Sequence, residues 1–206
     1  FKRPDETLDK AATRELAEET SVSAPMHLAQ FRAYGDPDRD PRSNVVTVAY
    51  LAATHDVGEI AAGTDAREAR LWSVMEALDG RDLAFDHHRI LTDALEYAAD
   101  QLEKSDLATA FLGPRFALSE LQSVYEELWG EKMDAGNFRS RLANPPPPES
   151  SSDQRNSAWS YVVATGERVK PSSKGGRPAE LYRAGDAWKL APPLRRSRNA
   201  WRTNDG

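Results

Sequence analysis

The chain has 206 residues, of which 39% are hydrophobic and 29% charged, so it can bury an apolar core and has room for two small domains. No stretch approaches the roughly 18 uninterrupted apolar residues of a membrane span, and no basic-then-apolar leader opens the sequence. The absence of cysteine excludes disulfides and thiolate zinc sites, and we expect a cytoplasmic protein without a membrane partner.

Charge divides the chain into two parts. Residues 1–112 carry 12 Lys and Arg against 22 Asp and Glu, whereas residues 113–206 carry 15 against 11. An acidic first part and a basic second part indicate two modules with different partners. The basic part is the one suited to a polyanion such as nucleic acid.

The first part predicts a helix followed by short strands. Asp5–Thr20 contains no internal Gly or Pro, and either Asp5 or Thr7 can act as its N-cap. Short apolar runs bounded by turn residues predict strands at His27–Ala33, Val45–Ala52, Gly58–Ala62 and Arg70–Val74.

The second part predicts helices and then a hairpin. Asp86 can cap a helix that runs to Lys104, at the place where the charge changes sign. A helix over Leu118–Trp129 should end at Gly130, and Asp134 should cap a short helix through Ala143. Two strands follow at Ser160–Val169 and Ala179–Arg183, after a Pro- and Ser-rich insertion at 145–157.

Three carboxylates gather on the first predicted helix. Glu15, Glu18 and Glu19 fall within about 100° of arc, so they repel one another. Arg14 lies four residues before Glu18 and can pair with it, which leaves Glu15 and Glu19 pointing together. A hard divalent cation such as Mg²⁺ would relieve the repulsion, although a solvated acidic helix face explains the same pattern.

A longer motif surrounds these carboxylates. Glu6, seven further residues and then Arg14–Val22 resemble the Nudix box, G-x5-E-x7-R-E-U-x-E-E-x-G-U. Its leading Gly would precede Phe1, so we expect the domain to begin before this chain. Its second Gly is replaced by Ser21, which must then adopt a backbone geometry that Gly reaches more easily. The resemblance implies Glu15, Glu18 and Glu19 as the Mg²⁺ site.

The loop after the first predicted strand carries two arginines, Arg39 and Arg42, near the nucleotide pocket that a Nudix domain implies. Either guanidinium could bind a phosphate of a nucleotide ligand. The alternative is that both form ion pairs with the loop carboxylates Asp36, Asp38 and Asp40.

The two short helices of the basic part predict a helix-turn-helix. Phe138 and Leu142 should face its core, which leaves a polar and basic surface for double-stranded DNA. The cations of the hairpin tip would contact phosphates, while an ordinary packing appendage remains the alternative. The predicted DNA-binding residues are Asn137, Arg139, Ser140, Arg141, Lys174 and Arg177.

Segments along the whole chain resemble the NrtR family, the Nudix-related transcriptional regulators of NAD metabolism. They are Leu83–His87, Phe116–Gln122, Asn137–Arg139 and Gly176–Arg183. The resemblance implies an α+β protein: a Nudix-type α/β/α sandwich in 1–85 that starts mid-domain, a connecting helix in 86–105 and a winged helix-turn-helix in 106–206. The insertion at 145–157 departs from the family pattern.

The resemblance also implies a function. Such proteins are homodimers that bind palindromic operators, repress NAD biosynthesis or salvage genes and leave the DNA when ADP-ribose binds the Nudix domain. Many have lost hydrolase activity, so catalytic residues are not expected. The alternatives are an active ADP-ribose pyrophosphatase with an accessory C-terminal domain, and a protein-interaction module on an inactive Nudix scaffold.

Overall fold

A computed structural model describes residues 5–22, 27–37, 39, 44–58, 71–78, 83, 85–143, 160–169 and 178–197. The chain divides into two compact units, residues 1–97 and 98–206, and the division falls inside helix α3 (His87–Lys104). Among the helices described, none is long and apolar enough to cross a membrane. The domain limits at 85 and 105 stay predictions.

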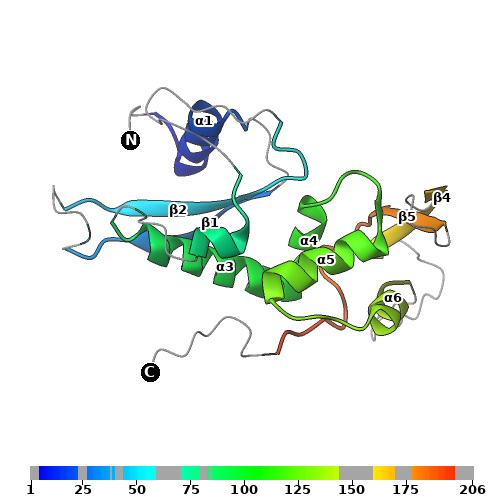
Figure 1. Ribbon diagram of the computed structural model, residues 1–206. Helices are drawn as coiled ribbons and strands as arrows, with labels where there is room; N and C mark the ends of the chain where they lie inside the picture. Colours follow the sequence, from blue (N-terminus) through cyan, green and yellow to red (C-terminus); the bar gives the residue numbers. More distant parts are fainter. Residues whose placement is uncertain are drawn as a thin grey trace, which may run out of the picture. The chain divides into compact units, whose positions relative to one another are not determined.

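The first unit contains helix α1 (Leu8–Thr20), strands β1 (His27–Tyr34) and β2 (Thr47–Ala53), helix α2 (Val74–Leu78) and the first part of α3. The two strands run antiparallel, and their register shifts between Gln30 and Arg32 (Figure 1). Phe31, at this irregularity, packs its ring against Tyr97 of α3 at 5.7 Å between centroids. The sheet and α3 therefore share an aromatic contact.

Polar contacts add to this packing. The hydroxyl of Tyr34 donates to Asp93 on α3 at 2.8 Å. Burial of the ring is the larger cause, and this hydrogen bond the smaller one, that raises the pKa of Tyr34 to about 12. The guanidinium groups of Arg32 and Arg89 lie 5.5 and 5.7 Å from the same ring, which is the range of cation–π attraction. A further hydrogen bond joins the sheet to α1, where the hydroxyl of Tyr50 on β2 donates to Asp9 at 2.8 Å.

Some predictions for the first unit are wrong. Leu71–Ser73 is not a strand, and Val74 begins α2 instead of ending a strand. The polar residues Ser73 and Glu76 explain this, because each side chain bonds the other's backbone N–H and so caps a helix. The strand predicted at Gly58–Ala62 lies outside the described residues except for Gly58, which is not in a strand.

The second unit contains the end of α3, the short helix α4 (Leu107–Ala110), strand β3 (Phe116–Ala117), helices α5 (Leu118–Trp129) and α6 (Ala135–Ala143), and strands β4 (Val162–Val169) and β5 (Ala179–Ala184). The strands form an antiparallel sheet in the order β3-β5-β4. The helices predicted at Leu118–Trp129 and from Asp134 to Ala143 are confirmed as α5 and α6. Gly130 ends α5 in the left-handed region at φ 66°. Strand β3 and helix α4 were not predicted.

Aromatic side chains fill the core of this unit. Tyr125 of α5 meets Trp129 edge-to-face at 5.0 Å and Phe138 of α6 at 5.6 Å. The indole of Trp129 donates to the carbonyl of Ala99 at 3.0 Å, and the hydroxyls of Tyr125 and Tyr161 lie 3.2 Å apart. The polar ends of these buried rings therefore have partners, as burial requires. Helices α3, α5 and α6 share one core with the start of the hairpin that β4 and β5 form.

The hairpin closes on a glycine. Gly185, just after β5, donates its N–H to Tyr161 at 2.9 Å. A Cβ at this position would come within 1.7 Å of the carbonyl oxygen of Ser160, so only glycine permits the approach.

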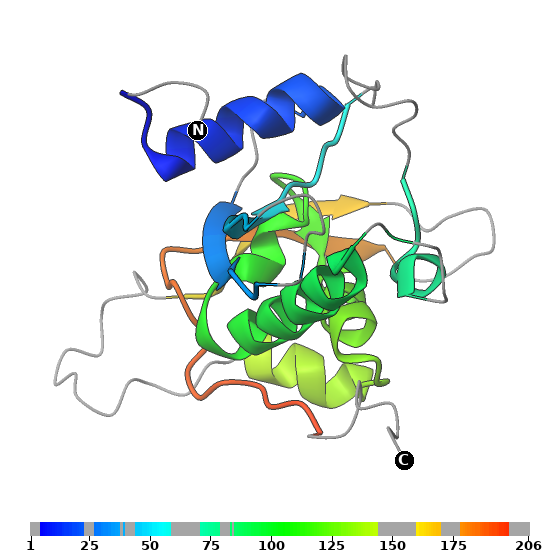
Figure 2. The same ribbon diagram turned by 90° about the vertical axis from the view of Figure 1, so that its left-hand side faces the viewer.

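The residues after β5, 186–197, form a segment that we call the C-terminal strap. It contains no helix or strand, yet Leu190 and Leu194 are buried at 5% and 8% exposure. Figure 2 shows the strap, coloured orange to red, passing close to α6, and a hydrogen bond joins the two. The sequence offered no pattern that distinguished it from a loose basic tail.

Candidate effector site and nucleic-acid interface

The motif helix α1 is organised by one arginine. Arg14 donates through Nε and Nη2 to both oxygens of Glu6, each at 2.9 Å, and through Nη1 to Glu18 at 2.9 Å. The hydrogen bond to Glu6 raises the pKa of the guanidinium above its usual value. The pairing of Arg14 with Glu18 is therefore confirmed, and the eight-residue spacing from Glu6 to Arg14 also has a structural cause. The fork fixes the segment before the helix against its second turn.

The carboxylates Glu15, Glu18 and Glu19 remain exposed on this helix. Their oxygens match the donor chemistry that Mg²⁺ prefers. Glu18 is held by Arg14, and Glu15 lies 3.4 Å from the same guanidinium. In the described part of the chain, no three acidic or histidine side chains are grouped as a metal centre would require. The donors suit the ion, but their arrangement does not form a complete site, so the metal assignment stays a prediction.

Ser21 occupies the position where the motif has glycine. It ends α1 with φ 64° and ψ 4°, and its N–H donates to the carbonyl of Ala17 at 3.0 Å. This is the left-handed geometry that the sequence required there. An L-residue adopts it at a cost that glycine avoids.

The structure shows two partners of Arg39 that the sequence did not suggest. Its guanidinium forms a fork with Asp86, from Nε at 2.9 Å and from Nη2 at 2.8 Å, and Nη1 donates to Thr47 at 2.7 Å. The hydrogen bond from Arg39 lowers the pKa of Asp86. The arginine thus fixes the start of α3, while its role toward a ligand stays a prediction. Arg42, Asp38 and Asp40 lie outside the described residues.

The turn between α5 and α6 depends on Glu126. Its carboxylate accepts from Lys132 Nζ at 2.7 Å, from the backbone N–H of Met133 at 3.0 Å and from Gln122 at 2.8 Å. These hydrogen bonds, first the one from Lys132, lower the pKa of Glu126 to about 2. A carboxylate with three donors sets the path of the chain into α6.

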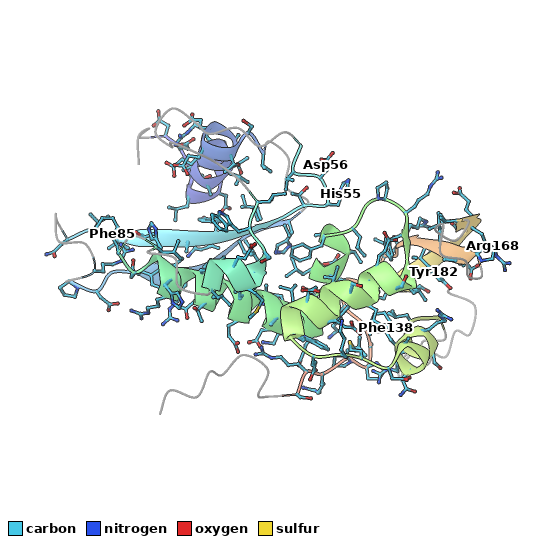
Figure 3. All side chains as sticks on the ribbon, viewed as in Figure 1. His55, Asp56, Phe85, Phe138, Arg168 and Tyr182 are labelled. Carbon is cyan, nitrogen blue, oxygen red and sulfur yellow. The ribbon has the colours of Figure 1, made fainter. Side chains whose placement is uncertain are left out.

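Helix α6 presents two different faces. Asp134 caps it, accepting from the N–H of Asn137 at 2.7 Å, as predicted. Phe138 and Leu142 are buried at 2% and 3% exposure, which confirms the predicted core face, and Figure 3 shows Phe138 among the elements of the second unit. On the other side three of the four predicted DNA-binding residues of the helix are exposed: Asn137, Arg139 and Ser140.

Arg141, the fourth, is only half-exposed, and its Nη2 donates to the carbonyl oxygens of Pro192 and Pro193 at 2.7 and 3.3 Å. The structure therefore separates Arg141 from the three exposed side chains. Lys174 and Arg177 of the hairpin tip, and the insertion at 145–157, lie outside the described residues.

The hairpin has a further cation that the sequence reasoning missed. Arg168 of β4 is exposed opposite Glu180 of β5 and lies at the outer end of the hairpin in Figure 3. The neighbouring Arg115 pairs with Glu167 at 2.7 Å. A search for cations in the last strand residues before the turn would have found Arg168.

Comparison with protein families matches two successive domains. Residues 1–94 match the NUDIX domain, and residues 108–145 match the NrtR DNA-binding winged helix domain. The chain therefore joins a NUDIX domain to a domain that matches the NrtR winged helix. This confirms the predicted fold class, a Nudix domain followed by a winged helix.

Relatives and solved structures agree with these two matches. The chain is 31% identical over 179 residues to the "ADPR responsive transcriptional repressor NtrR" of Acinetobacter baylyi, covering 87% of this chain and 64% of the relative. It is 36% identical over 94 residues to the "ADP-ribose pyrophosphatase" of Methanocaldococcus jannaschii, covering 45% of this chain and 52% of the relative. The chain thus spans less than two thirds of the length of either curated relative.

The crystal structure of Shewanella oneidensis NrtR complexed with a 27mer DNA has a TM-score of 0.70 and 25% identity to this chain, covering 95% of this chain and 82% of that one. The likeness extends over both the Nudix and the winged helix parts of the chain.

Proposed function

We propose that this chain is a DNA-binding repressor of NAD biosynthesis or salvage genes that ADP-ribose releases from its operator. One observation carries the proposal: α6 buries Phe138 and Leu142 and exposes Asn137, Arg139 and Ser140 within a domain that matches the NrtR DNA-binding winged helix. Asn and Arg side chains suit the edges of adenine and guanine in the major groove. A bacterial regulator of this kind works in the cytoplasm.

Phosphate contacts are assigned to the hairpin. Arg168 is exposed on β4, and Lys174 and Arg177 are the cations predicted for the hairpin tip. Such contacts add affinity and orientation without sequence information. Two copies of the chain, as a homodimer, would match the two halves of a palindromic operator.

The effector site is assigned to the Nudix domain. The relative from Acinetobacter baylyi is named for its response to ADP-ribose, and this supports the same ligand here. Glu15 and Glu19, with Glu18 supporting them through Arg14, are the proposed ligands of Mg²⁺ beside the diphosphate. Arg39 and Arg42 are the proposed phosphate-binding residues. A bound ligand changes DNA affinity only as far as it favours one of two conformations.

The decisive experiment is DNA binding titrated with ADP-ribose. A fluorescent duplex from the promoter of an NAD-synthesis gene is mixed with the full chain at low salt, with and without Mg²⁺. We expect the anisotropy to rise on binding and to fall again as ADP-ribose is added. No binding at low salt, or binding that ADP-ribose leaves unchanged, contradicts the proposal.

A second function is a working ADP-ribose pyrophosphatase. The intact fork between Arg14 and Glu6 and the likeness to the Methanocaldococcus jannaschii enzyme favour it. The test is release of AMP from ADP-ribose in the presence of Mg²⁺, compared with a Glu19→Gln variant. Release by the unmodified chain that the variant lacks supports this activity, and no release from either excludes it.

A further inference from the structure

The C-terminal strap holds its place through contacts at both ends and in the middle. Leu190 and Leu194 lie in the core of the second unit, although the strap has no backbone ladder of its own. Burial of a leucine side chain is stabilising and opposes the entropy lost when an irregular segment is ordered. The strap is therefore a built part of the winged helix domain.

Arg141 joins the C-terminal strap to helix α6. Its Nη2 donates to the carbonyl oxygens of two consecutive prolines, Pro192 and Pro193. Proline has no backbone N–H and resists entering a strand ladder, so the side chain of Arg141 supplies a contact that a ladder would supply elsewhere. The contact reaches across 51 residues of sequence.

The far end of the strap is joined to two other elements. The N–H of Arg196 donates to Glu103 at 3.0 Å, and its Nη2 donates to Asp100 at 2.8 Å, both on α3. The N–H of Ser197 donates to Glu131 in the α5–α6 turn at 3.0 Å. The strap thus connects α3, the turn and α6 within one unit.

We propose that the C-terminal strap sets the position of α6 for DNA binding, and that Arg141 is a positioning residue that acts through the strap. Helix α6 has nine residues, and its buried residues Phe138 and Leu142 lie four apart in one row. A short helix held along a single row can rotate about that row. Arg141 on its flank supplies the lateral contact that opposes this rotation.

The proposal rests on the proposed DNA-binding function and reassigns Arg141 within it. If Arg141 instead contacts a phosphate, its removal reduces the salt dependence of binding by about 0.9 in the logarithmic slope and is independent of the strap. If it acts through the strap, loosening the strap elsewhere produces the same effect. Arg196 is the place to loosen it, because its guanidinium contacts Asp100 rather than α6.

The test is a double-mutant cycle on the full chain. Arg141→Ala, Arg196→Ala and the double variant bind two fluorescent duplexes, the 27mer of the Shewanella oneidensis complex and a scrambled duplex of equal length. Arg195→Ala is the matched control. It removes a neighbouring arginine of the strap whose side chain is 76% exposed and whose ion pair with Glu103, at 3.6 Å, is longer than the 2.8 Å bond from Arg196 to Asp100. We expect each single variant to weaken binding about tenfold and the double variant to lose little more, since both act through one element.

Fully additive losses, or an Arg196→Ala variant that binds like the unmodified chain, overturn the proposal. Hydrogen exchange of the α6 amides without DNA gives a second readout. Faster exchange in Arg196→Ala but not in Arg195→Ala supports the strap, and equal exchange in both contradicts it. This measurement needs no DNA binding, so failure of the unmodified chain to bind either duplex counts against the proposed function alone.

Discussion

Helices α1 and α6 both carry charged side chains toward a proposed ligand, but they are held in different ways. Ala11 is the one residue of α1 that is buried, and polar contacts from Arg14, Asp9 and Thr7 hold the helix in place. In α6 two apolar side chains enter an aromatic core. Ion pairs weaken with salt and titrate, whereas apolar burial does neither. We therefore expect salt and pH to affect the position of α1 more than the position of α6.

The largest effect should come from removing the apolar support of α6. Phe138→Ala leaves a cavity beside Tyr125, and we expect a loss of about 3–5 kcal/mol in the free energy of unfolding. Urea denaturation of the full chain measures it. Ser140→Ala, on the exposed side of the same helix, should change stability by less than about 0.5 kcal/mol. Equal losses from both variants would break the contrast between the two faces.

The exposed face of α6 should matter for DNA instead of stability. We expect Arg139→Ala to weaken duplex binding about tenfold, because an arginine–base contact is worth about 1–3 kcal/mol. The melting temperature should stay within about 1 °C of the unmodified chain, as for most exposed substitutions. Arg32→Ala, a half-exposed arginine of the first unit, is the control for general loss of charge. Equal weakening in the two variants contradicts a specific role for Arg139.

Acid should loosen the helix-turn-helix through Glu126. Its pKa falls from 4.5 to about 2 on folding, so the stabilisation is complete above pH 4.5. It is then lost as the pH decreases from 4.5 through about 2, when the carboxylate takes up a proton. Unfolding by urea at a series of pH values measures this slope.

Glu126→Gln is the matched variant for that series. It keeps one acceptor for Met133 and cannot titrate, so its stability should change less between pH 4.5 and 2 than that of the unmodified chain. Parallel curves for the two proteins would show that other carboxylates account for the acid sensitivity.

The smallest effect concerns the end of α1. Ser21→Gly relieves the left-handed backbone at φ 64°, and we expect a gain of up to about 1 kcal/mol in unfolding free energy, reduced by the greater freedom of glycine in the unfolded chain. Ala17→Gly, inside the same helix, should have the opposite sign and cost about 1 kcal/mol. Calorimetry separates the two. A loss of stability in Ser21→Gly would show that the serine side chain contributes more than the backbone strain removes.

Features with local causes could be predicted from the sequence. The bounds of α5, the cap of Asp134 on α6, the stop at Gly130, the pairing of Arg14 with Glu18 and the unusual backbone of Ser21 all depend on residues within a few positions of one another. Helix periodicity, capping and turn geometry act over that range, which is why a single sequence reveals them. The family resemblance added the order of the domains.

Contacts between residues far apart in the sequence could not be predicted, because they depend on how the elements pack. Arg39 pairs with Asp86 across 47 residues and Arg141 with Pro192 across 51, and no local spacing announces either contact. The same holds for β3, whose two residues form a strand only because β5 lies beside them. The packing of the elements determines which partner a side chain meets. The sequence therefore showed that Arg39 and Arg141 were cations of interest, and the structure showed which groups they bind.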